Sequence, residues 1–192
     1  MKKILQFGIA IIAVSLHAQA GSLDTSFGTN GKVITSINSG ADKAYSVAMQ
    51  LDGKIVVGGM TTNASTGQDF VCIRYNTDGS LDNSFASGGI FTNDVQLGSD
   101  DVVYSIVIQS DGKIILAGSS DDGSNKNAAM MRLNSNGTID TTFGTAGKTL
   151  TDFITGRADE IKTVKIHLLT GNIIVGGTSA ASTTNSQAII AR

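Results

Sequence analysis

Short apolar runs, separated by turn-forming residues, recur along the chain and predict a protein built from β-strands. In the first well-defined stretch, runs at about 45–50 and 54–59 flank Asp52-Gly53. This dipeptide suits a tight hairpin because both of its residues can adopt a positive φ angle. A further run at 32–37 precedes the hairpin and another at 69–75 follows it. The pattern predicts four short antiparallel strands in one twisted sheet, with no room for a helix.

One heptapeptide occurs three times at constant spacing. It reads Gly-Ser-Leu-Asp-Thr-Ser-Phe from Gly21, Gly-Ser-Leu-Asp-Asn-Ser-Phe from Gly79 and Gly-Thr-Ile-Asp-Thr-Thr-Phe from Gly137, so each copy begins 58 residues after the one before. Each unit closes on an apolar run that ends in arginine. A fixed spacing of this size is typical of a repeat protein. The approximate units are 21–78, 79–136 and 137–192.

The repeat also predicts how the sheets pack. A lone four-stranded sheet has two faces and cannot bury both, so it needs neighbours. Stacking similar sheets around an axis buries both faces, which is the β-propeller architecture, whereas a linear β-solenoid has shorter rungs with fewer hairpins. We therefore expect an all-β fold, a β-propeller-like array of about three four-stranded antiparallel blades.

Three blades are fewer than the ~4 that a closed propeller usually needs. Two interpretations are open. The sequence is an N-terminal fragment of a longer protein, or three-blade chains associate, for example as two chains in a six-blade ring. The sequence favours the fragment, because it contains no distinct C-terminal capping or sorting segment and an open array needs capped ends.

Spaced motifs within the units resemble those of a known family. They are Leu-Asp-x-Ser-Phe-Gly-x-x-Gly-Lys-Val from Leu23, Gln-x-Asp-Gly-Lys-Ile-Val-Val-Gly-Gly from Gln50, and Arg-Tyr-Asn-x-Asp-Gly-Ser-Leu-Asp from Arg74. Over residues 21–192 the chain is similar to the delta-60 repeat family. The resemblance implies a β-propeller-like array in an exported bacterial protein, with a poorly defined molecular function. The third unit has His167 where the others have glutamine, so the geometry of its hairpin stays open.

The first twenty residues read as a secretory signal peptide. Lys2 and Lys3 form a positively charged start, residues 4–16 an apolar core, and Ala-Gln-Ala at 18–20 a small-residue cleavage site. The core is shorter than the ~20 residues of a membrane span, although a retained N-terminal anchor is the competing interpretation. Cleavage before Gly21 leaves 12 basic and 16 acidic side chains, a net charge of −4. We expect a secreted or cell-surface protein with no membrane span after cleavage and no nucleic-acid-binding surface.

A search for catalytic chemistry leaves few candidates. His17 lies in the signal peptide, so His167 is the only histidine of the mature chain. A Ser-His-Asp triad, a two-histidine metal site and an HExxH helix therefore each lack a required residue, and His167 is interpreted as a polar residue at a strand end. The sequence also lacks a Walker loop and a dinucleotide fingerprint. We assign no catalytic, cofactor-binding or metal-binding residue, and we expect no enzyme activity.

Aspartates recur at two fixed places in every unit. The first series is Asp24, Asp82 and Asp140, and the second is Asp42, Asp101 and Asp159. A residue that is present in every unit is better explained by a turn or a cap than by catalysis, which arises at one place. Segment 76–82 also has the alternating oxygen atoms of a calcium loop, without the full acidic series or the glutamate. Asx-turns are the favoured interpretation there, and calcium binding stays open.

Aromatic and basic residues recur beside these aspartates. The phenylalanines are Phe27, Phe85 and Phe143, and the arginines are Arg74, Arg132 and Arg192. We interpret the phenylalanines as plugs between adjacent sheets rather than as ligand-stacking residues, and we expect the arginines to pair with the repeated aspartates. In particular, Arg74 and Asp82 are hypothesised to lock one blade to the next, which makes the heptapeptide the joint between blades. Cys72, the only cysteine, lies in an apolar run and is expected to be a buried free thiol.

These observations favour a non-enzymatic function. We expect an exported β-propeller module that acts as a scaffold or binding surface for an unknown protein or glycan ligand, with cell-surface adhesion as one such role. Ligands of propellers generally contact loops, and the variable loops are expected at 61–68, 119–127 and 178–187. The alternative is the repeat region of a secreted enzyme whose catalytic domain is missing from this sequence. The remaining blades would come from a longer chain or from self-association.

Overall fold

The chain folds into three antiparallel β-sheets, which we call blades 1, 2 and 3. A computed structural model describes residues 21–182 and 184–192, so the signal-peptide prediction for residues 1–20 lies outside the described residues. Blade 1 contains β1 (Asp42–Met49), β2 (Ile55–Asn63), β3 (Gly67–Tyr75) and β4 (Ile90–Asn93). Blade 2 contains β5 (Asp100–Ile108), β6 (Ile114–Asp121), β7 (Lys126–Leu133) and β8 (Lys148–Thr151). Blade 3 contains β9 (Ala158–Ile166), β10 (Ile173–Ser182) and β11 (Asn185–Ala191).

The prediction of an all-β array of about three blades is confirmed. Neighbouring strands in every sheet follow one another along the chain, and all of them pair in antiparallel fashion. Blades 1 and 2 have four strands, and blade 3 has three among the described residues. The described part of the chain has no helix that could cross a membrane.

The expectation that one sequence unit forms one sheet is wrong in one respect. The run at 90–93 belongs to the second unit, yet it pairs as β4 with β3 of blade 1, and β8 pairs in the same way with β7. The corresponding run of the first unit, at 32–37, forms no strand. The reason is the path of the heptapeptide, which folds back on the strand before it through a bridge between Tyr75 and Leu81. The run that follows it therefore reaches the open edge of the same sheet.

The hairpins between the first and second strands are wider than predicted. In blade 1 the N–H of Gln50 donates to the carbonyl of Lys54 at 2.8 Å, which leaves a three-residue loop. Gly53 has a φ of 83°, whereas Asp52 is not in the positive-φ region, so the prediction of two positive φ angles is wrong. A three-residue loop needs only one left-handed residue, at its end. The hairpin after His167, whose geometry the sequence left open, contains four residues.

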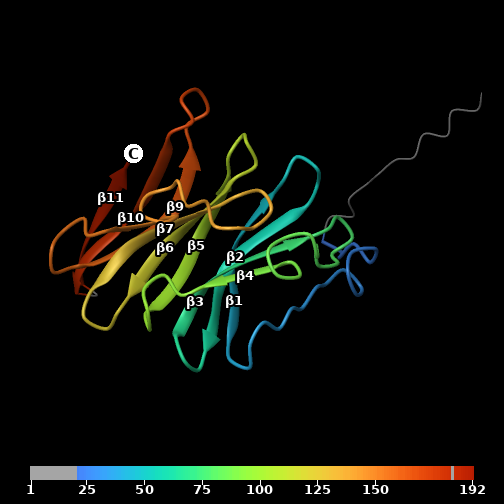
Figure 1. Cartoon of the computed structure of the whole chain (residues 1–192), viewed down its shortest axis with the longest axis horizontal. Coiled ribbons are helices and arrows are strands. Elements are labelled where there is room, and N and C mark those ends of the chain that lie inside the picture. The colour runs from blue at the N-terminus through green and yellow to red at the C-terminus, as the bar shows by residue number, and fades with distance from the viewer. Residues whose placement is uncertain (1–20, 183) are drawn as a thin grey trace, which may run out of the picture.

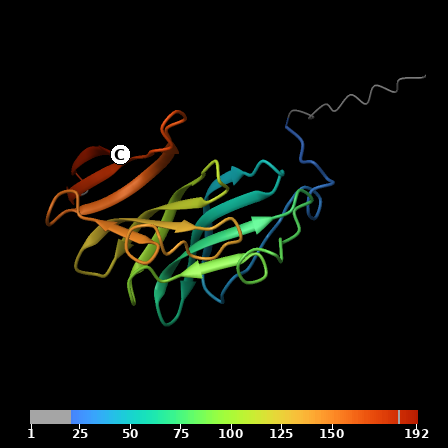
Figure 2. The same cartoon turned by 45° about the horizontal axis from the view of Figure 1, so that its top comes forward.

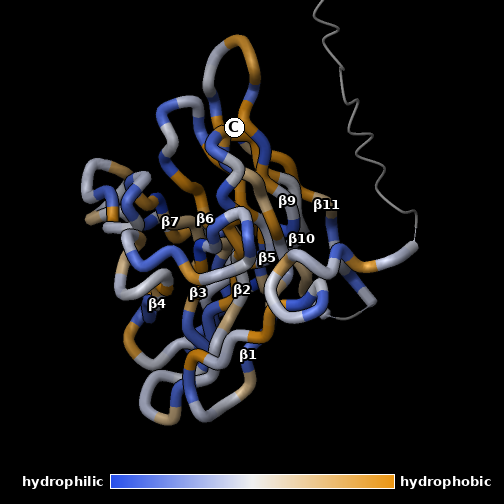
Figure 3. The backbone as a smooth tube through the Cα atoms, turned by 90° about the vertical axis from the view of Figure 1, so that its right-hand side faces the viewer, coloured by the Kyte–Doolittle hydropathy of each residue, from blue (hydrophilic) through white to orange (hydrophobic). Residues whose placement is uncertain are grey.

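Apolar side chains pack together in both spaces between the blades. Val56, Phe70 and Leu116 belong to the core between blades 1 and 2, while Ile115 and Ile161 belong to the core between blades 2 and 3. Alternate residues of β6 therefore face opposite cores, as the period of a strand requires. Figures 1 and 2 show the blades in series, with the N-terminal and C-terminal ends of the described chain far apart. Figure 3 shows hydrophobic segments within the stacked strands.

The first segment of the chain covers the outer face of blade 1. Val33 and Ile37 pack there against Val71, Ile73 and Tyr75, which are all buried. This segment is not a strand of blade 1, so the contact is made by side chains on the face of the sheet.

Candidate functional site

The heptapeptide aspartate of blade 1 sits at the centre of a polar joint. Oδ1 of Asp82 accepts hydrogen bonds from the N–H and the hydroxyl of Ser84 at 3.0 and 2.6 Å. Its Oδ2 contacts Nζ of Lys54 at 2.8 Å and Nε of Arg74 at 2.7 Å. The hydrogen bond from Lys54, followed by those from Ser84, holds the pKa of Asp82 well below its usual range. Both carboxylate oxygens are engaged, which supports a structural role.

The same joint recurs between β7 and β8. Asp140 accepts hydrogen bonds from the N–H and hydroxyl of Thr142 at 3.1 and 2.7 Å. It also contacts Arg132 at 2.7 Å and Lys113 at 2.9 Å. The hydroxyl of Thr142 and then the Lys113 ammonium lower the pKa of Asp140. The predicted pairing of repeated arginines with repeated aspartates is therefore confirmed in two of the three units.

Asp24, the first of the heptapeptide aspartates, and Arg192, the last of the repeated arginines, lie apart and are exposed. Oδ1 of Asp24 accepts the hydroxyl and the N–H of Ser26 at 2.6 and 2.9 Å, and these hydrogen bonds lower the pKa of Asp24. Among residues 21–182 and 184–192, no arginine contacts Asp24 and no aspartate contacts Arg192. The predicted pairing of Arg192 within this chain is therefore wrong.

Arg74 crosses from blade 1 to blade 2. Its Nη1 donates to the carbonyl of Ser135 at 2.5 Å, and its guanidinium carbon lies 4.5 Å from the centre of the Phe85 ring. Phe85 is fully buried in the core between the two blades. Arg132 stacks on Phe143 in the same manner, at 4.8 Å. The interpretation of these rings as plugs is confirmed, and the energetic effect of the lock stays a prediction.

Consecutive copies of the heptapeptide lie directly on one another. The N–H of Ala86 donates to the carbonyl of Asn136 at 2.8 Å, and an equivalent hydrogen bond joins the first copy to the second. A Cβ atom at Gly137 would lie only 2.8 Å from the ring of Phe85. The glycine that opens the second and the third copy thus leaves room for the phenylalanine of the copy before it, and the prediction of a joint is confirmed.

The second series of aspartates fixes the loops that enter the blades. In each blade Oδ2 accepts the N–H of the same loop position, from Ile37 to Asp42 at 3.0 Å, from Val95 to Asp101 at 2.5 Å and from Phe153 to Asp159 at 2.6 Å. Asp101 is fully buried, and this burial raises the pKa of Asp101. The interpretation of these residues as caps is confirmed.

The calcium-like segments form Asx-turns. Oδ1 of Asp78 accepts the N–H and the hydroxyl of Ser80 at 2.9 and 2.7 Å, and Asn136 does the same with Thr138 at 3.1 and 2.8 Å. In the part of the chain that the structure describes, no three His, Cys, Asp or Glu side chains gather where they could hold a metal ion. The favoured interpretation of these segments is confirmed.

His167 and Cys72 lie where the sequence predicts. His167 directly follows β9 and is exposed, with Nδ1 3.0 Å from the hydroxyl of Thr170. Cys72 is fully buried in β3, and burial raises the pKa of its thiol to about 12. A thiol with such a pKa stays protonated at neutral pH and is a poor nucleophile.

The expected variable loops are largely strand. The turns are only 64–66 in blade 1 and 122–125 in blade 2, and in blade 3 the strands continue to Ser182 and resume at Asn185. Within the first of these segments, Thr61 pairs with Asp69 across the hairpin. The expectation of loops at 61–68, 119–127 and 178–187 is therefore wrong. Their Ser, Thr and Asn content suggests loops, but these polar residues pair in antiparallel strands just as well when a neighbouring strand is adjacent.

Five aromatic and charged side chains form a cluster, four of them on the first strands of the blades and the fifth, Lys126, at the start of β7. Tyr45 in β1 and Tyr104 in β5 occupy equivalent β-bulges, with ring centres 5.6 Å apart and ring planes tilted by 58°. Lys162 occupies the equivalent bulge in β9, and its Nζ lies 3.6 Å from the centre of the Tyr104 ring. Glu160 contacts Lys162 at 2.6 Å and Lys126 at 3.2 Å. We call these five residues the first-strand cluster.

The charges of the first-strand cluster support one another at a partly open surface. Burial opposes ionisation of Glu160, but the hydrogen bond and the charge of Lys162 prevail and lower the pKa of Glu160. Tyr45 remains 46% exposed. An exposed aromatic face beside paired donors and acceptors can stack on an apolar surface of a ligand while it binds polar groups at the edge.

Sequence reasoning missed the first-strand cluster. Its side chains come from all three units and meet only because adjacent first strands are held together. Ser46 accepts the N–H of Ile106 at 3.0 Å, and Ser105 accepts the N–H of Val164 at 3.1 Å. The one available signal was the Tyr-Ser dipeptide that is shared by the first two units, at 45–46 and 104–105.

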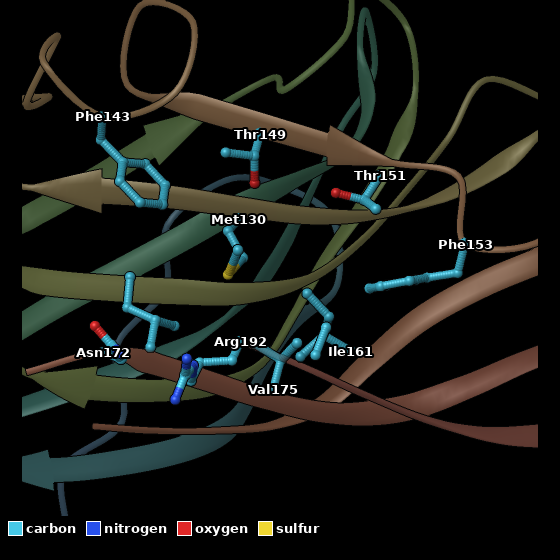
Figure 4. A pocket seen from close by; sticks show the side chains of 11 residues that line it. Met130, Phe143, Thr149, Thr151, Phe153, Ile161, Asn172, Val175 and Arg192 are labelled. Carbon is cyan, nitrogen blue, oxygen red and sulfur yellow. The ribbon is translucent and has the colours of Figure 1, made fainter. Parts of the chain in front are cut away.

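A cleft of about 480 Å³ separates parts of blades 2 and 3 (Figure 4). Apolar side chains from both sheets line it, among them Met130, Phe153, Ile161 and Val175, with Arg192 also on the wall. Positions equivalent to Thr149 and Ala191 of this cleft are filled in the core between blades 1 and 2 by the larger Phe91 and Met131. The cleft therefore reflects smaller side chains at an otherwise repeated interface.

Comparison with known proteins supports a repeat of this kind. Residues 50–85 and 109–143 match the model of a β-propeller domain of unknown function, DUF5122. Each match runs from the first hairpin of a blade through the following heptapeptide, so the matched segments are equivalent in blades 1 and 2. No curated protein matches the chain. The chain therefore carries β-propeller-like repeats, and the narrower delta-60 resemblance stays a prediction.

Proposed function

We propose that the chain is an exported, non-enzymatic β-propeller module that binds a glycan through the first-strand cluster. The observation that carries the proposal is the exposed side chain of Tyr45 beside Tyr104, whose ring in turn contacts Lys162 of the Glu160–Lys162 pair. Aromatic rings with a polar edge suit ligands that have one apolar and one hydroxylated face. A protein ligand is the competing choice, and cell-surface adhesion is the biological role that either ligand would serve.

The repeated carboxylates support a non-enzymatic role. Asp82 and Asp140 are each engaged by an arginine, a lysine and a hydroxyl, and Asp101 and Asp159 hold the backbone of loops. A general acid or base needs a proton that can exchange with substrate at the working pH. Carboxylates whose pKa values are held well below their usual range, like those of Asp82 and Asp140, stay ionised and hydrogen-bonded instead.

Glycan-array binding of the purified chain tests the function. We expect binding to a defined set of glycans, and we expect Tyr45→Ala to weaken it about tenfold or more, because a central aromatic contact typically carries about 2 kcal/mol. Leu51→Ala is the matched control, since Leu51 is exposed in the hairpin at the far end of β1. A chain that binds no glycan on the array, or a Tyr45→Ala variant that binds like the parent, contradicts the glycan proposal.

Export is tested separately. Expression of the full sequence in a secreting bacterium should release a mature protein that starts at Gly21, which mass spectrometry of the N-terminus measures. Retention of residues 1–20 on a membrane-bound product would instead favour the N-terminal anchor.

A further inference from the structure

Blade 3 has an edge at which blades 1 and 2 carry another strand. In blade 1, β3 pairs with β2 on one side and with β4 on the other, where Cys72 lies opposite Phe91. Among the described residues, β11 pairs with β10 alone. Ile190 occupies the position in β11 that Cys72 occupies in β3. Ile190 is 82% exposed, whereas Cys72 is fully buried.

The segment that follows the first heptapeptide has the turn geometry that would fit such an edge. The N–H of Gly31 donates to the carbonyl of Phe27 at 2.9 Å, and the same hydrogen bond folds the second and third copies. Positive φ angles at Asn30 and Gly31 repeat those at the equivalent positions of the later copies. Val33 stands 58 residues before Phe91, yet its segment joins no sheet. Residues 24–35 thus have the local structure that leads into β4 and β8, but within 21–182 and 184–192 they pair with no strand.

The faces of blade 1 and blade 3 that would meet each expose an apolar side chain whose equivalent in at least one other blade is buried. Val47 of β1 is 68% exposed, although its equivalents Ile106 and Val164 are 6% and 1% exposed because each packs on the preceding blade. Blade 1 therefore leaves open, beside the part that Val33 and Ile37 cover, the face with which blades 2 and 3 dock onto their neighbours. Blade 3 presents the opposite face, including Ile190, to which such a neighbour would dock.

We propose that residues 24–35 of one copy pair with β11 of a second copy of this chain, so that blade 3 of the second copy packs on blade 1 of the first. The observed pairing of β3 with β4 and of β7 with β8 sets the register. Lys32 lies opposite Ala191 and Val33 lies opposite Ile190. Arg192 then reaches Asp24, as Arg74 reaches Asp82 within the chain.

A second copy is the occupant that the interface chemistry favours. Both halves of the contact are already on this chain, and each repeats an interface that the chain makes internally between its own blades. The two halves lie at opposite ends of the molecule, so one chain does not satisfy both by itself (Figure 1). If two copies exchange both contacts, the assembly is a closed ring with two-fold symmetry, and a single exchange per copy gives an open head-to-tail series.

Charge exchange across the contact gives a direct test. Asp24→Arg and Arg192→Asp each place like charges opposite one another, so each variant alone should associate at least about tenfold more weakly than the parent. A mixture of the two variants restores opposite charges at both contacts and should form heterodimers. Asp111→Arg is the matched control, because Asp111 is an exposed turn carboxylate in blade 2 that also accepts one backbone N–H.

Sedimentation velocity and light scattering measure these outcomes over a range of concentrations. Self-association of the parent, loss in each single variant and recovery in the mixture support the proposal. A parent chain that stays monomeric up to ~100 μM, single variants that associate like the parent, or a mixture that fails to recover would each overturn it.

The register has its own test. Mixing Val33→Cys with Ile190→Cys under oxidising conditions should give a disulfide-linked dimer, because directly opposed residues of an antiparallel pair lie close enough to be bridged. Ile34→Cys is the control, since a shift of one residue points the side chain to the other face. Equal cross-linking of Val33→Cys and Ile34→Cys would overturn the register even if the chains associate.

Discussion

The contribution of the contact between consecutive heptapeptides to stability can be tested by replacing one glycine with alanine, which adds a single methyl group. Gly137 has a φ of 85°, and a Cβ at this position would lie 2.7 Å from the amide nitrogen of Ala86 and 2.8 Å from the Phe85 ring. Gly123 has nearly the same φ, 83°, but nothing lies within 4 Å of its Cβ position. Gly137→Ala and Gly123→Ala therefore share one backbone penalty and differ in the contact with the preceding copy.

The structure sets the size of the difference. An alanine in the left-handed region costs about 1–2 kcal/mol, and this cost applies to both variants. Gly137→Ala must in addition push apart a backbone and a fully buried ring, and overpacking of this kind typically costs about 1–3 kcal/mol. We expect a loss in unfolding free energy of about 2–5 kcal/mol for Gly137→Ala and about 1–2 kcal/mol for Gly123→Ala.

Urea unfolding followed by circular dichroism measures both losses. With a typical slope of about 2 kcal/mol per molar urea, an extra 2 kcal/mol lowers the midpoint of Gly137→Ala by about 1 M relative to Gly123→Ala. Equal midpoints for the two variants would refute the reasoning, because they would mean that the contact between copies contributes nothing beyond the turn itself.

Three further predictions concern the same joint. Phe85→Ala should cost about 3–5 kcal/mol in urea unfolding, because Phe85 is fully buried, and Phe27→Ala, at a half-buried equivalent, should cost less than half as much. A double-mutant cycle of Arg74→Ala and Asp82→Ala should show a coupling of about 1–3 kcal/mol in the free energy of unfolding, whereas additive losses of stability would speak against a lock between the blades. The pKa values of Asp82 and Asp140 are lowered by folding, so their stabilisation is present at neutral pH and is lost as the pH falls below about 4. Thermal unfolding between about pH 7 and pH 2 should therefore depend less on pH in Asp82→Asn, and an unchanged profile would contradict this.

Repetition made the architecture readable from the sequence. A residue that returns in every unit beside an apolar run is expected to serve the fold of each unit, and this reasoning placed Asp82, Phe85 and Arg74 at the joint between blades. Burial of Cys72 followed from its apolar neighbours alone. Local pattern was enough for the pairing of Arg74 with Asp82 because the two residues lie only eight positions apart in the sequence.

The sequence reasoning failed where pairing between distant segments decides the structure. The run at 32–37 has the apolar pattern of a strand, but a strand exists only where a sheet edge is available, and its equivalents find that edge in the preceding unit. The polar segments at 61–68 and 119–127 are strands for the same reason, since each continues a hairpin already in register. Tyr45 and Tyr104 come into contact only because β1 and β5 lie side by side, and the sequence of a single unit does not specify this arrangement.

The pattern of repetition also distinguishes residues that hold the blades together from residues that would bind a ligand. At the joint, blades 1 and 2 use the same residue types with their polar atoms already paired, so little remains there to distinguish one ligand from another. In the first-strand cluster the tyrosine of blades 1 and 2 is replaced in blade 3 by Lys162, and Glu160 takes the place of Val102. A ligand at this cluster would therefore meet a different surface at blade 3 than at blades 1 and 2, and such asymmetry fixes one orientation for the ligand. A binding site is expected where the repeat is broken, because specificity comes from contacts that a competing position does not offer.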